Sequence, residues 1–218
     1  GESMKQVLIV EDQRMPRENM ERVISESNNY EFAASVNGAD VALAICRRQR
    51  IDLVLMDVCT AGNKDGIEAA AEIKAEFPNI KIIIVTSMVE VGYLQRAREA
   101  KVDSFWYKDS PSSDLVGVIE GTLSGKSCWP DSTPAVQLGN TLSCGLSDQE
   151  LETLRLLCEG QTNAEIAAGM SVAESTVRTY INRMLEKTGY PNRNRLMVAA
   201  VSKRLVVPGS LFGTAEEN

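Results

Sequence analysis

The chain has 218 residues, of which 44% are hydrophobic and 24% charged, and it carries a formal net charge of −7. This composition is ordinary for a globular protein with one large domain or two small ones. Because the chain contains no histidine, a histidine-based catalytic triad, a histidine-bearing zinc site and a phosphohistidine carrier are all excluded. We expect a cytoplasmic protein with reduced cysteines and no membrane partner, since the sequence has no long apolar run, signal-peptide pattern or CxxC pair.

The charge is distributed unevenly along the chain. Residues 1–124 contain 14 basic and 20 acidic residues, whereas residues 175–205 contain seven basic residues and a single acidic one. An acidic first part joined to a basic segment predicts two domains with different tasks.

The first part of the chain alternates between two patterns. Apolar, β-branched runs occur at residues 6–10, 32–36, 51–56, 81–85 and 102–107, and the segments between them have helical spacing. A repeat of about 25 residues is typical of βα units, and near-continuous apolar strands indicate burial on both faces. Residues 4–124 are therefore predicted to form an α/β domain with a doubly wound, five-stranded parallel sheet of the flavodoxin-like kind.

The pattern changes after residue 124. Residues 125–145 are rich in Gly, Pro, Ser and Thr and are predicted to be a linker, in which Trp129 is either a packing anchor or exposed. From Leu146 the spacing is helical, and Ser147 with Glu150 predicts a capping box. Residues 146–210 are expected to form a small all-α domain.

Polar residues stand at the ends of four predicted strands. Glu11 and Asp12 follow the first strand, Asp57 the third, Thr86 the fourth and Lys108 the fifth. The carboxyl ends of parallel strands form one crevice, so these side chains should meet there. Each residue alone is more simply a polar strand end, but together they predict three carboxylates around Mg²⁺, a lysine and a hydroxyl for phosphate oxygens, and Asp57 as a nucleophile toward a phosphoryl group.

The segments LIVEDQ, LVLMDV, IIIVTS and SFWYKD resemble the strand ends of a two-component response-regulator receiver domain, over residues 4 to about 124. The resemblance implies that Asp57 is the phosphoacceptor and that Thr86 and Lys108 bind the phosphoryl group. It also implies that Phe105 is the switch aromatic. The implied Mg²⁺ ligands are Glu11, Asp12, Asp57 and the backbone carbonyl of Cys59.

The loop after Asp57 departs from this family. Ala61 stands where the family usually has proline, and Gly66 comes nine residues after Asp57 instead of eight. We expect a loop over residues 58–66 that is one residue longer and more mobile than usual, because it lacks the fixed φ of proline and contains Gly62.

In the last part, TNAEIAAGM and ESTVRTYINRMLEKTG predict the two helices of a helix-turn-helix, with a basic surface helix of a bundle as the alternative. In a helix-turn-helix the second helix enters the major groove. Its apolar positions, such as Val177 and Ile181, should face the core. Its predicted groove-facing residues are Ser175, Arg178, Thr179, Asn182 and Arg183.

Residues 146–205 are similar to the LuxR-type output domain, which together with the receiver marks the NarL/FixJ class of response regulators. The similarity implies that Arg178, Thr179, Asn182 and Arg183 approach bases and that Lys187, Arg193 and Asn163 contact the phosphate backbone. Residues 196–201 resemble the dimerisation helix of that domain. Ala173 departs from the family, because alanine replaces the usual helix-capping serine.

These features predict a DNA-binding transcriptional regulator controlled by phosphorylation. A sensor histidine kinase would donate the phosphoryl group, Mg²⁺ would be the cofactor, and a homodimer would bind double-stranded DNA when phosphorylated. The chain is not expected to be a turnover enzyme for an external substrate. Two alternatives remain open: a degenerate receiver that acts without phosphorylation, and an aspartyl-phosphate hydrolase, although Cys59 stands where such an enzyme has its second acid.

Overall fold

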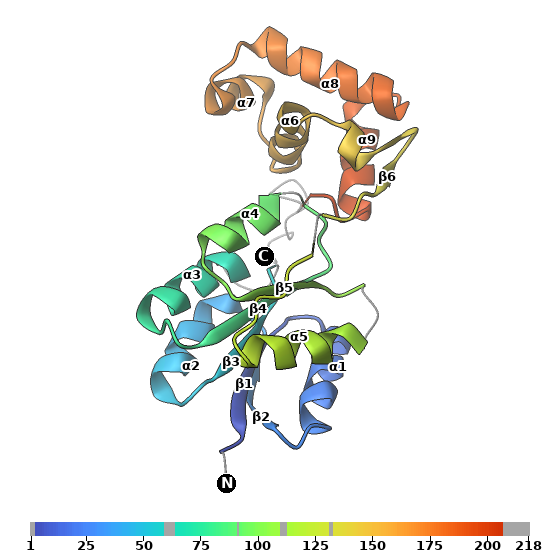
Figure 1. Ribbon diagram of the computed structural model, residues 1–218. Coiled ribbons are helices and arrows are strands. Elements are labelled where there is room, and N and C mark those ends of the chain that lie inside the picture. Colours follow the sequence, from blue (N-terminus) through green and yellow to red (C-terminus); the bar gives the residue numbers. More distant parts are fainter. Residues whose placement is uncertain (1–2, 59–63, 91, 110–112, 131–132, 207–218) are drawn as a thin grey trace, which may run out of the picture. The chain divides into compact units, whose positions relative to one another are not determined.

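The computed structural model describes residues 3–58, 64–90, 92–109, 113–130 and 133–206. The chain divides into two compact units (Figure 1). One comprises Gly1–Ser87 with Gly92–Ser132, and the other Met88–Val91 with Thr133–Asn218. The first is a parallel sheet covered by helices and the second is helical, which confirms the predicted fold class.

The sheet of the first unit has five parallel strands in the order β2-β1-β3-β4-β5. Each predicted apolar run overlaps one of them. This order makes the sheet doubly wound, and the direction of winding reverses between β1 and β3, the position at which open α/β sheets bind ligands. The strands are β1 (Lys5–Val10), β2 (Tyr30–Val36), β3 (Leu53–Met56), β4 (Lys81–Thr86) and β5 (Ser104–Tyr107).

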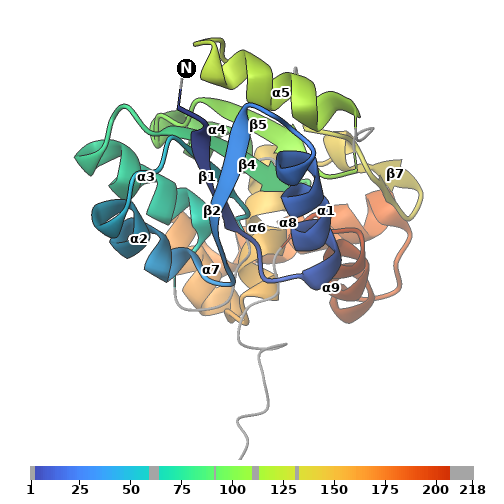
Figure 2. The same ribbon diagram turned by 90° about the horizontal axis from the view of Figure 1, so that it is seen from below.

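Helices cover both faces of this sheet (Figures 1 and 2). On one face lie α1 (Arg14–Ser25) and α5 (Ser113–Leu123), which share an apolar cluster with β1, β3, β4 and β5. The opposite face is covered by α2 (Ala42–Arg48), α3 (Gly66–Glu76) and α4 (Gly92–Glu99), and a short 3-10 turn, η1 (Ala39–Val41), precedes α2. Burial on both faces explains the continuous apolar runs: the side chains of residues 82–85 in β4 are all fully buried.

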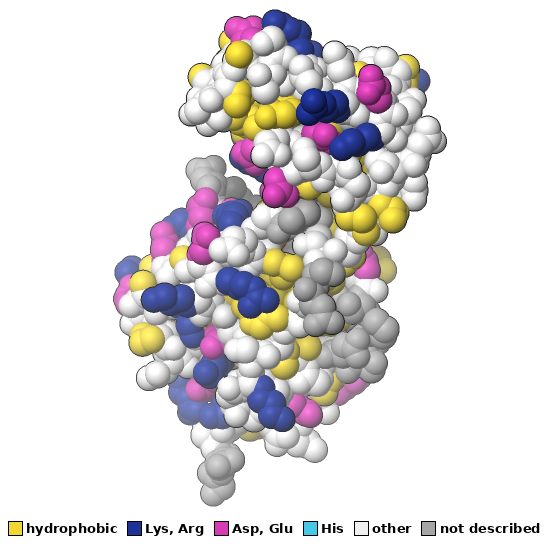
Figure 3. Space-filling model, turned by 45° about the horizontal axis from the view of Figure 1, so that its top comes forward, with side chains coloured by type: hydrophobic (Ala, Val, Ile, Leu, Met, Phe, Trp, Pro, Cys, Tyr) yellow, Lys and Arg dark blue, Asp and Glu magenta, His cyan; other side chains and the backbone are white. Residues whose placement is uncertain are grey.

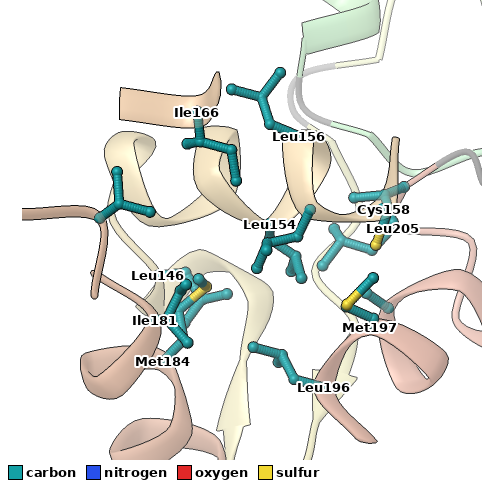
Figure 4. Close-up of a cluster of buried hydrophobic side chains, with 14 of the residues drawn as sticks. Leu146, Leu154, Leu156, Cys158, Ile166, Ile181, Met184, Leu196, Met197 and Leu205 are labelled. Atoms are coloured by element: carbon teal, nitrogen blue, oxygen red, sulfur yellow. The ribbon is translucent and has the colours of Figure 1, made fainter. Parts of the chain in front are cut away.

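The second unit packs four helices around one apolar cluster, part of which Figure 4 shows. Side chains such as Leu154, Ile181 and Leu196 meet in it from three different helices. The predicted capping box of Ser147 and Glu150 is present, and Thr162 and Glu165 form a second one. The helices are α6 (Asp148–Cys158), α7 (Asn163–Met170), α8 (Glu174–Thr188) and α9 (Arg193–Ser202).

The segment that we expected to be a linker is largely structured. Its residues 133–145 belong to the second unit, where β6 (Gln137–Leu138) and β7 (Thr141–Leu142) form a hairpin followed by a 3-10 turn, η2 (Ser143–Gly145). The hairpin turn rests on the end of α8: the Asn140 N–H donates to the Thr188 carbonyl at 2.8 Å. A side chain at Gly139 would collide with that same carbonyl, so the turn depends on glycine.

Two expectations about the whole chain can be compared with the part that the structure describes. None of its described helices has the length and apolar character that a membrane span requires. The four cysteines among the described residues, Cys46, Cys128, Cys144 and Cys158, form no disulfide in the structure, and their reduced state stays an expectation.

The substitution Ala173→Ser is expected to stabilise α8. Ala173 occupies the N-cap in extended conformation (φ −75°, ψ 153°) without a side-chain cap, and a serine hydroxyl there would accept a first-turn N–H. Opening of the first turn should become about 1 kcal/mol costlier, which slows amide exchange about five-fold. Hydrogen–deuterium exchange of peptides from α8 measures this. The matched control is Ala168→Ser, an exposed interior position of α7 that should gain no protection, and equal behaviour of the two variants would contradict the capping argument.

Candidate functional site

The strand order places the polar strand ends side by side at one edge of the sheet. Val10 and Met56 are register partners in β1 and β3, so Glu11 and Asp57 follow neighbouring positions, and the Asp57 N–H donates to the Val10 carbonyl at 3.0 Å. On β4 and β5, the Lys108 N–H donates to the Thr86 carbonyl at 2.9 Å. The hydrogen bonds between the strands thereby place Glu11, Asp12, Asp57, Thr86 and Lys108 at the same edge of the sheet.

The three carboxylates form a compact cluster. One oxygen from each of Glu11, Asp12 and Asp57 lies within 4.8 Å of the others. Glu11 is fully buried and Asp57 is 4% exposed, whereas Asp12 faces solvent. The Lys108 ammonium lies 2.5 Å from a Glu11 oxygen and 3.3 Å from an Asp57 oxygen, and the Gln13 N–H donates to the other Glu11 oxygen at 3.1 Å.

The negative charge of Asp57 is only partly balanced by its neighbours in this cluster. Burial raises the pKa of Asp57 to about 7, Lys108 opposes the rise, and the charge and hydrogen bond of Glu11 add to it. One ammonium thus faces two buried carboxylates and an exposed third. Since all donors are oxygens and the excess charge is negative, the residues present fit a hard divalent cation such as Mg²⁺.

The end of the loop after Asp57 is held by three contacts. The Gly66 N–H donates to the Val58 carbonyl at 2.8 Å, and a side chain at Gly66 would lie 1.8 Å from the Asp57 carbonyl. Asp65 caps α3 by accepting the Glu68 N–H, and it also binds Arg96 of α4 at 2.6 Å. Residues 59–63, which include the predicted ligand Cys59 and the positions expected to make the loop mobile, lie outside the described residues.

The two predicted switch residues are both buried. Thr86 is fully buried at the end of β4, and Phe105 on β5 is 2% exposed. The Phe105 ring contacts Tyr107 edge to face, with centroids 5.1 Å apart, and stacks on Trp129 at 5.9 Å. Sequence reasoning found Phe105 but left Trp129 unassigned, because no periodic pattern surrounds that tryptophan.

The second unit contains the predicted helix-turn-helix. The helices α7 and α8 are joined through Ser171, which is left-handed (φ 57°, ψ 44°). Val177, Ile181 and Met184 of α8 are buried in the core, as expected. The five predicted groove-facing residues of α8 are all exposed: Ser175, Arg178, Thr179, Asn182 and Arg183.

The residues predicted to contact phosphate have partners within the unit. Lys187 binds both oxygens of the buried Glu150, at 2.9 and 3.0 Å, and the Gly145 carbonyl. Arg193 donates to the Asn163 side chain at 2.8 Å, so these two predicted residues lie together. Lys187 therefore stabilises the start of α6, and its contact with phosphate stays a prediction. Figure 3 shows Lys and Arg side chains on the surface of the second unit, beside a few Asp and Glu.

A carboxylate cluster at the switch point of a doubly wound sheet, joined to a helix-turn-helix, defines a receiver linked to a DNA-binding domain. Residues 7–120 match the response regulator receiver domain, and residues 145–200 match the bacterial regulatory proteins of the luxR family. The receiver match alone spans more than half of the chain. The chain therefore belongs to the response regulators, in the NarL/FixJ class.

Individual relatives agree with this assignment. The response regulator protein VraR of Staphylococcus epidermidis and that of Staphylococcus aureus are each 28% identical over 206 residues, covering 92% of this chain and 98% of theirs. A two-component response regulator of the LuxR family from Aurantimonas sp. SI85-9A1 is 28% identical, with a TM-score of 0.55 over 61% of this chain and 91% of that one. RcsB from Salmonella enterica serovar Typhimurium, solved bound to a promoter in the presence of the phosphomimetic BeF3−, shares the fold at 21% identity, with a TM-score of 0.62 over 92% of this chain and 99% of that one.

Glycine at position 66 is expected to be essential for the shape of the cluster. A methyl group in Gly66→Ala would overlap the Asp57 carbonyl, so the variant should lose about 1–3 kcal/mol of unfolding free energy, the usual cost of overpacking. The matched control is Gly117→Ala, an exposed position of α5 with no atom within 4 Å of the added methyl group. That control should be stabilised by about 0.5–1 kcal/mol through helix propensity. Urea denaturation of both variants measures the difference, and equal stability would contradict the close approach.

Proposed function

We propose that this chain is a transcriptional regulator whose DNA binding is controlled by phosphorylation of Asp57. The observation that carries the proposal is the cluster of Glu11, Asp12, Asp57 and Lys108 at one edge of the sheet, in a chain that also carries a helix-turn-helix with an exposed polar face. The promoter-bound RcsB structure with a phosphomimetic, which shares this fold, supports the same interpretation.

In this proposal a carboxylate oxygen of Asp57 attacks the phosphorus of a phosphohistidine. A new O–P bond replaces the N–P bond, and the departing imidazole nitrogen keeps the bonding electron pair. Because this chain has no histidine, the phosphohistidine belongs to a partner, a sensor histidine kinase. The chain accepts a phosphoryl group and is not a turnover enzyme for an external substrate.

The neighbouring side chains prepare and hold the phosphoryl group. Lys108, already 3.3 Å from Asp57, would bind a phosphoryl oxygen through its ammonium, and the Thr86 hydroxyl would donate to another. Glu11, Asp12 and Asp57, together with the Cys59 carbonyl, would hold Mg²⁺, which when bound neutralises carboxylate and phosphoryl charge. Thr86 and Phe105 then move toward the modified Asp57.

The DNA contacts follow from the exposed face of α8. Its first turns enter the major groove, where Ser175, Arg178, Thr179, Asn182 and Arg183 reach base edges. Arg193 with Asn163, and Lys187, contact the phosphate backbone and set the register.

A homodimer would place two such helices on two half-sites. Three residues of α9, Leu196, Met197 and Ala200, are buried within the unit, while Val198 is 56% exposed and available to a second copy. Two weak half-site contacts made together bind far more tightly than either alone. Phosphorylation would raise DNA affinity by favouring this pairing.

Phosphorylation is tested with acetyl phosphate, or a histidine kinase, and Mg²⁺. The wild type should incorporate one phosphoryl group per chain, and both Asp57→Asn and omission of Mg²⁺ should abolish incorporation, as measured by intact mass. The matched control is Asp52→Asn beside the opposite end of β3, which should label normally because its side chain accepts the Gln6 N–H and pairs with Arg50, away from the carboxylate cluster. A degenerate receiver predicts no labelling at all, while DNA binding persists.

The DNA interface is tested with the site enriched by in vitro selection and with random DNA. Arg178→Ala should lose about 1–3 kcal/mol on the selected site and relax its sequence preference, as expected for a base contact. Arg193→Ala should weaken binding to both DNAs equally and lower the salt slope by about 1. Arg48→Ala, an exposed residue of α2, is the control and should change neither. Equal effects of Arg178→Ala on both DNAs would refute its base contact.

A further inference from the structure

The first residues after α5 do not leave the first unit but run along β5. β5 is the last strand in the sheet order, so one of its edges has no neighbouring strand among the residues that the structure describes. There the Phe105 N–H donates to the Cys128 carbonyl at 2.9 Å, and the Cys128 N–H donates to the Ser104 hydroxyl at 3.0 Å. Ser104 also bonds the Thr122 hydroxyl of α5 at 2.6 Å, which ties this segment to both β5 and α5.

Trp129 ends this segment and lies on the Phe105 ring. The two ring planes differ by 28° with centroids 5.9 Å apart, and the indole N–H donates to the Asp103 carbonyl at 3.1 Å. The Arg98 guanidinium of α4 lies over the indole, 4.3 Å from its centroid. The indole is thus positioned by the Phe105 ring, the Arg98 guanidinium and the Asp103 carbonyl. These three contacts fix its orientation, which a loose apolar contact would not do.

The ring beneath Trp129 is directly connected to the carboxylate site. Phe105 lies on β5 three residues before Lys108, which directly follows that strand, and its ring touches that of Tyr107, the register partner of Thr86. Any displacement of Thr86 and Phe105 toward Asp57 therefore removes the surface on which Trp129 stacks. The segment is joined to Phe105 through its backbone as well, so it must respond to such a displacement.

We propose that Trp129 reports the state of Asp57 to the connection between the two domains: its stack on Phe105 holds the segment Lys126–Trp129 on β5, and phosphorylation weakens that stack and releases the segment. The proposal rests on the phosphorylation of Asp57 put forward above. It assigns a function to a residue outside both family matches.

The first test is the fluorescence of Trp129 in the full chain. Only Trp106 and Trp129 are present, so Trp106→Phe leaves Trp129 as the single reporter. The Trp106 indole N–H has no hydrogen-bond partner in the described part of the chain, so this replacement breaks no hydrogen bond found there. Beryllofluoride with Mg²⁺ should shift the Trp129 emission to longer wavelength and increase its quenching by acrylamide at least two-fold, and the added Asp57→Asn should abolish both changes.

Binding of beryllofluoride is followed independently through the rise in thermal midpoint, which separates the two proposals. If the midpoint rises and Trp129 emission does not change, the role of Trp129 is overturned while the phosphoacceptor site stands. If neither changes in the wild type, the phosphoacceptor proposal fails first.

The second test asks whether the stack controls output. Trp129→Ala should raise DNA affinity without beryllofluoride and reduce the beryllofluoride-dependent gain at least three-fold. Arg98→Gln removes the cation but leaves the indole on Phe105, so it should change DNA affinity and the beryllofluoride-dependent gain in the same direction but by less. This milder variant keeps the test valid if Trp129→Ala has a folding defect. Circular dichroism checks that both variants are folded. If beryllofluoride then raises the DNA affinity of both folded variants as much as that of the wild type, the proposal is overturned.

Discussion

Lys108 places its ammonium 2.5 Å from Glu11 and 3.3 Å from Asp57, and both carboxylates lie almost completely out of water. Buried charges are costly unless they are paired, and here one cation serves two buried anions with Asp12 beside them. The cluster is therefore short of positive charge. Burial raises the pKa of Asp57 to about 7, because the opposing effect of Lys108 does not offset it and Glu11 adds to the rise. A divalent cation would relieve this shortage, and the phosphoryl group that we propose on Asp57 would change the charge again, so the neighbouring side chains are the ones expected to respond.

The surrounding scaffold decides which side chains respond. The central strands are buried on both faces, and a close-packed interior resists displacement of the strands that carry Glu11 and Asp57. Gly66 closes the site from the other side, because its backbone lies against the Asp57 carbonyl. In the proposed mechanism the response falls to two side chains, Thr86 and Phe105, which lie on β4 and β5.

The sequence predicted much of this arrangement because the relevant signals are local. Apolar runs with βα spacing predict a parallel sheet, and a parallel sheet requires that Glu11, Asp57 and Lys108 share one edge. The helical domain was predictable because the capping box of Ser147 with Glu150 and the helical spacing of apolar residues are also local signals. The seat of Trp129, the hairpin over residues 137–142 and the pairing of Lys187 with Glu150 were not predictable. The contacts of Trp129 and the pair of Lys187 with Glu150 join segments far apart in sequence, and the two-residue strands of the hairpin are too short to leave a periodic pattern.

The two cores also constrain how the domains communicate. Each unit buries its own apolar cluster, and one connection between them is the chain that follows Trp129. That chain is short: seven residues separate Trp129 on β5 from Gln137 of the hairpin. The hairpin in turn contacts Thr188 at the carboxyl end of α8, the end away from the first turns that we propose to read bases. In the mechanism proposed above, a change at Trp129 would reach α8 at its carboxyl end and leave the geometry of Arg178 and Asn182 intact. In this proposal, control acts on whether two copies of α8 are available together, while the sequence preference for DNA depends on the exposed residues of α8.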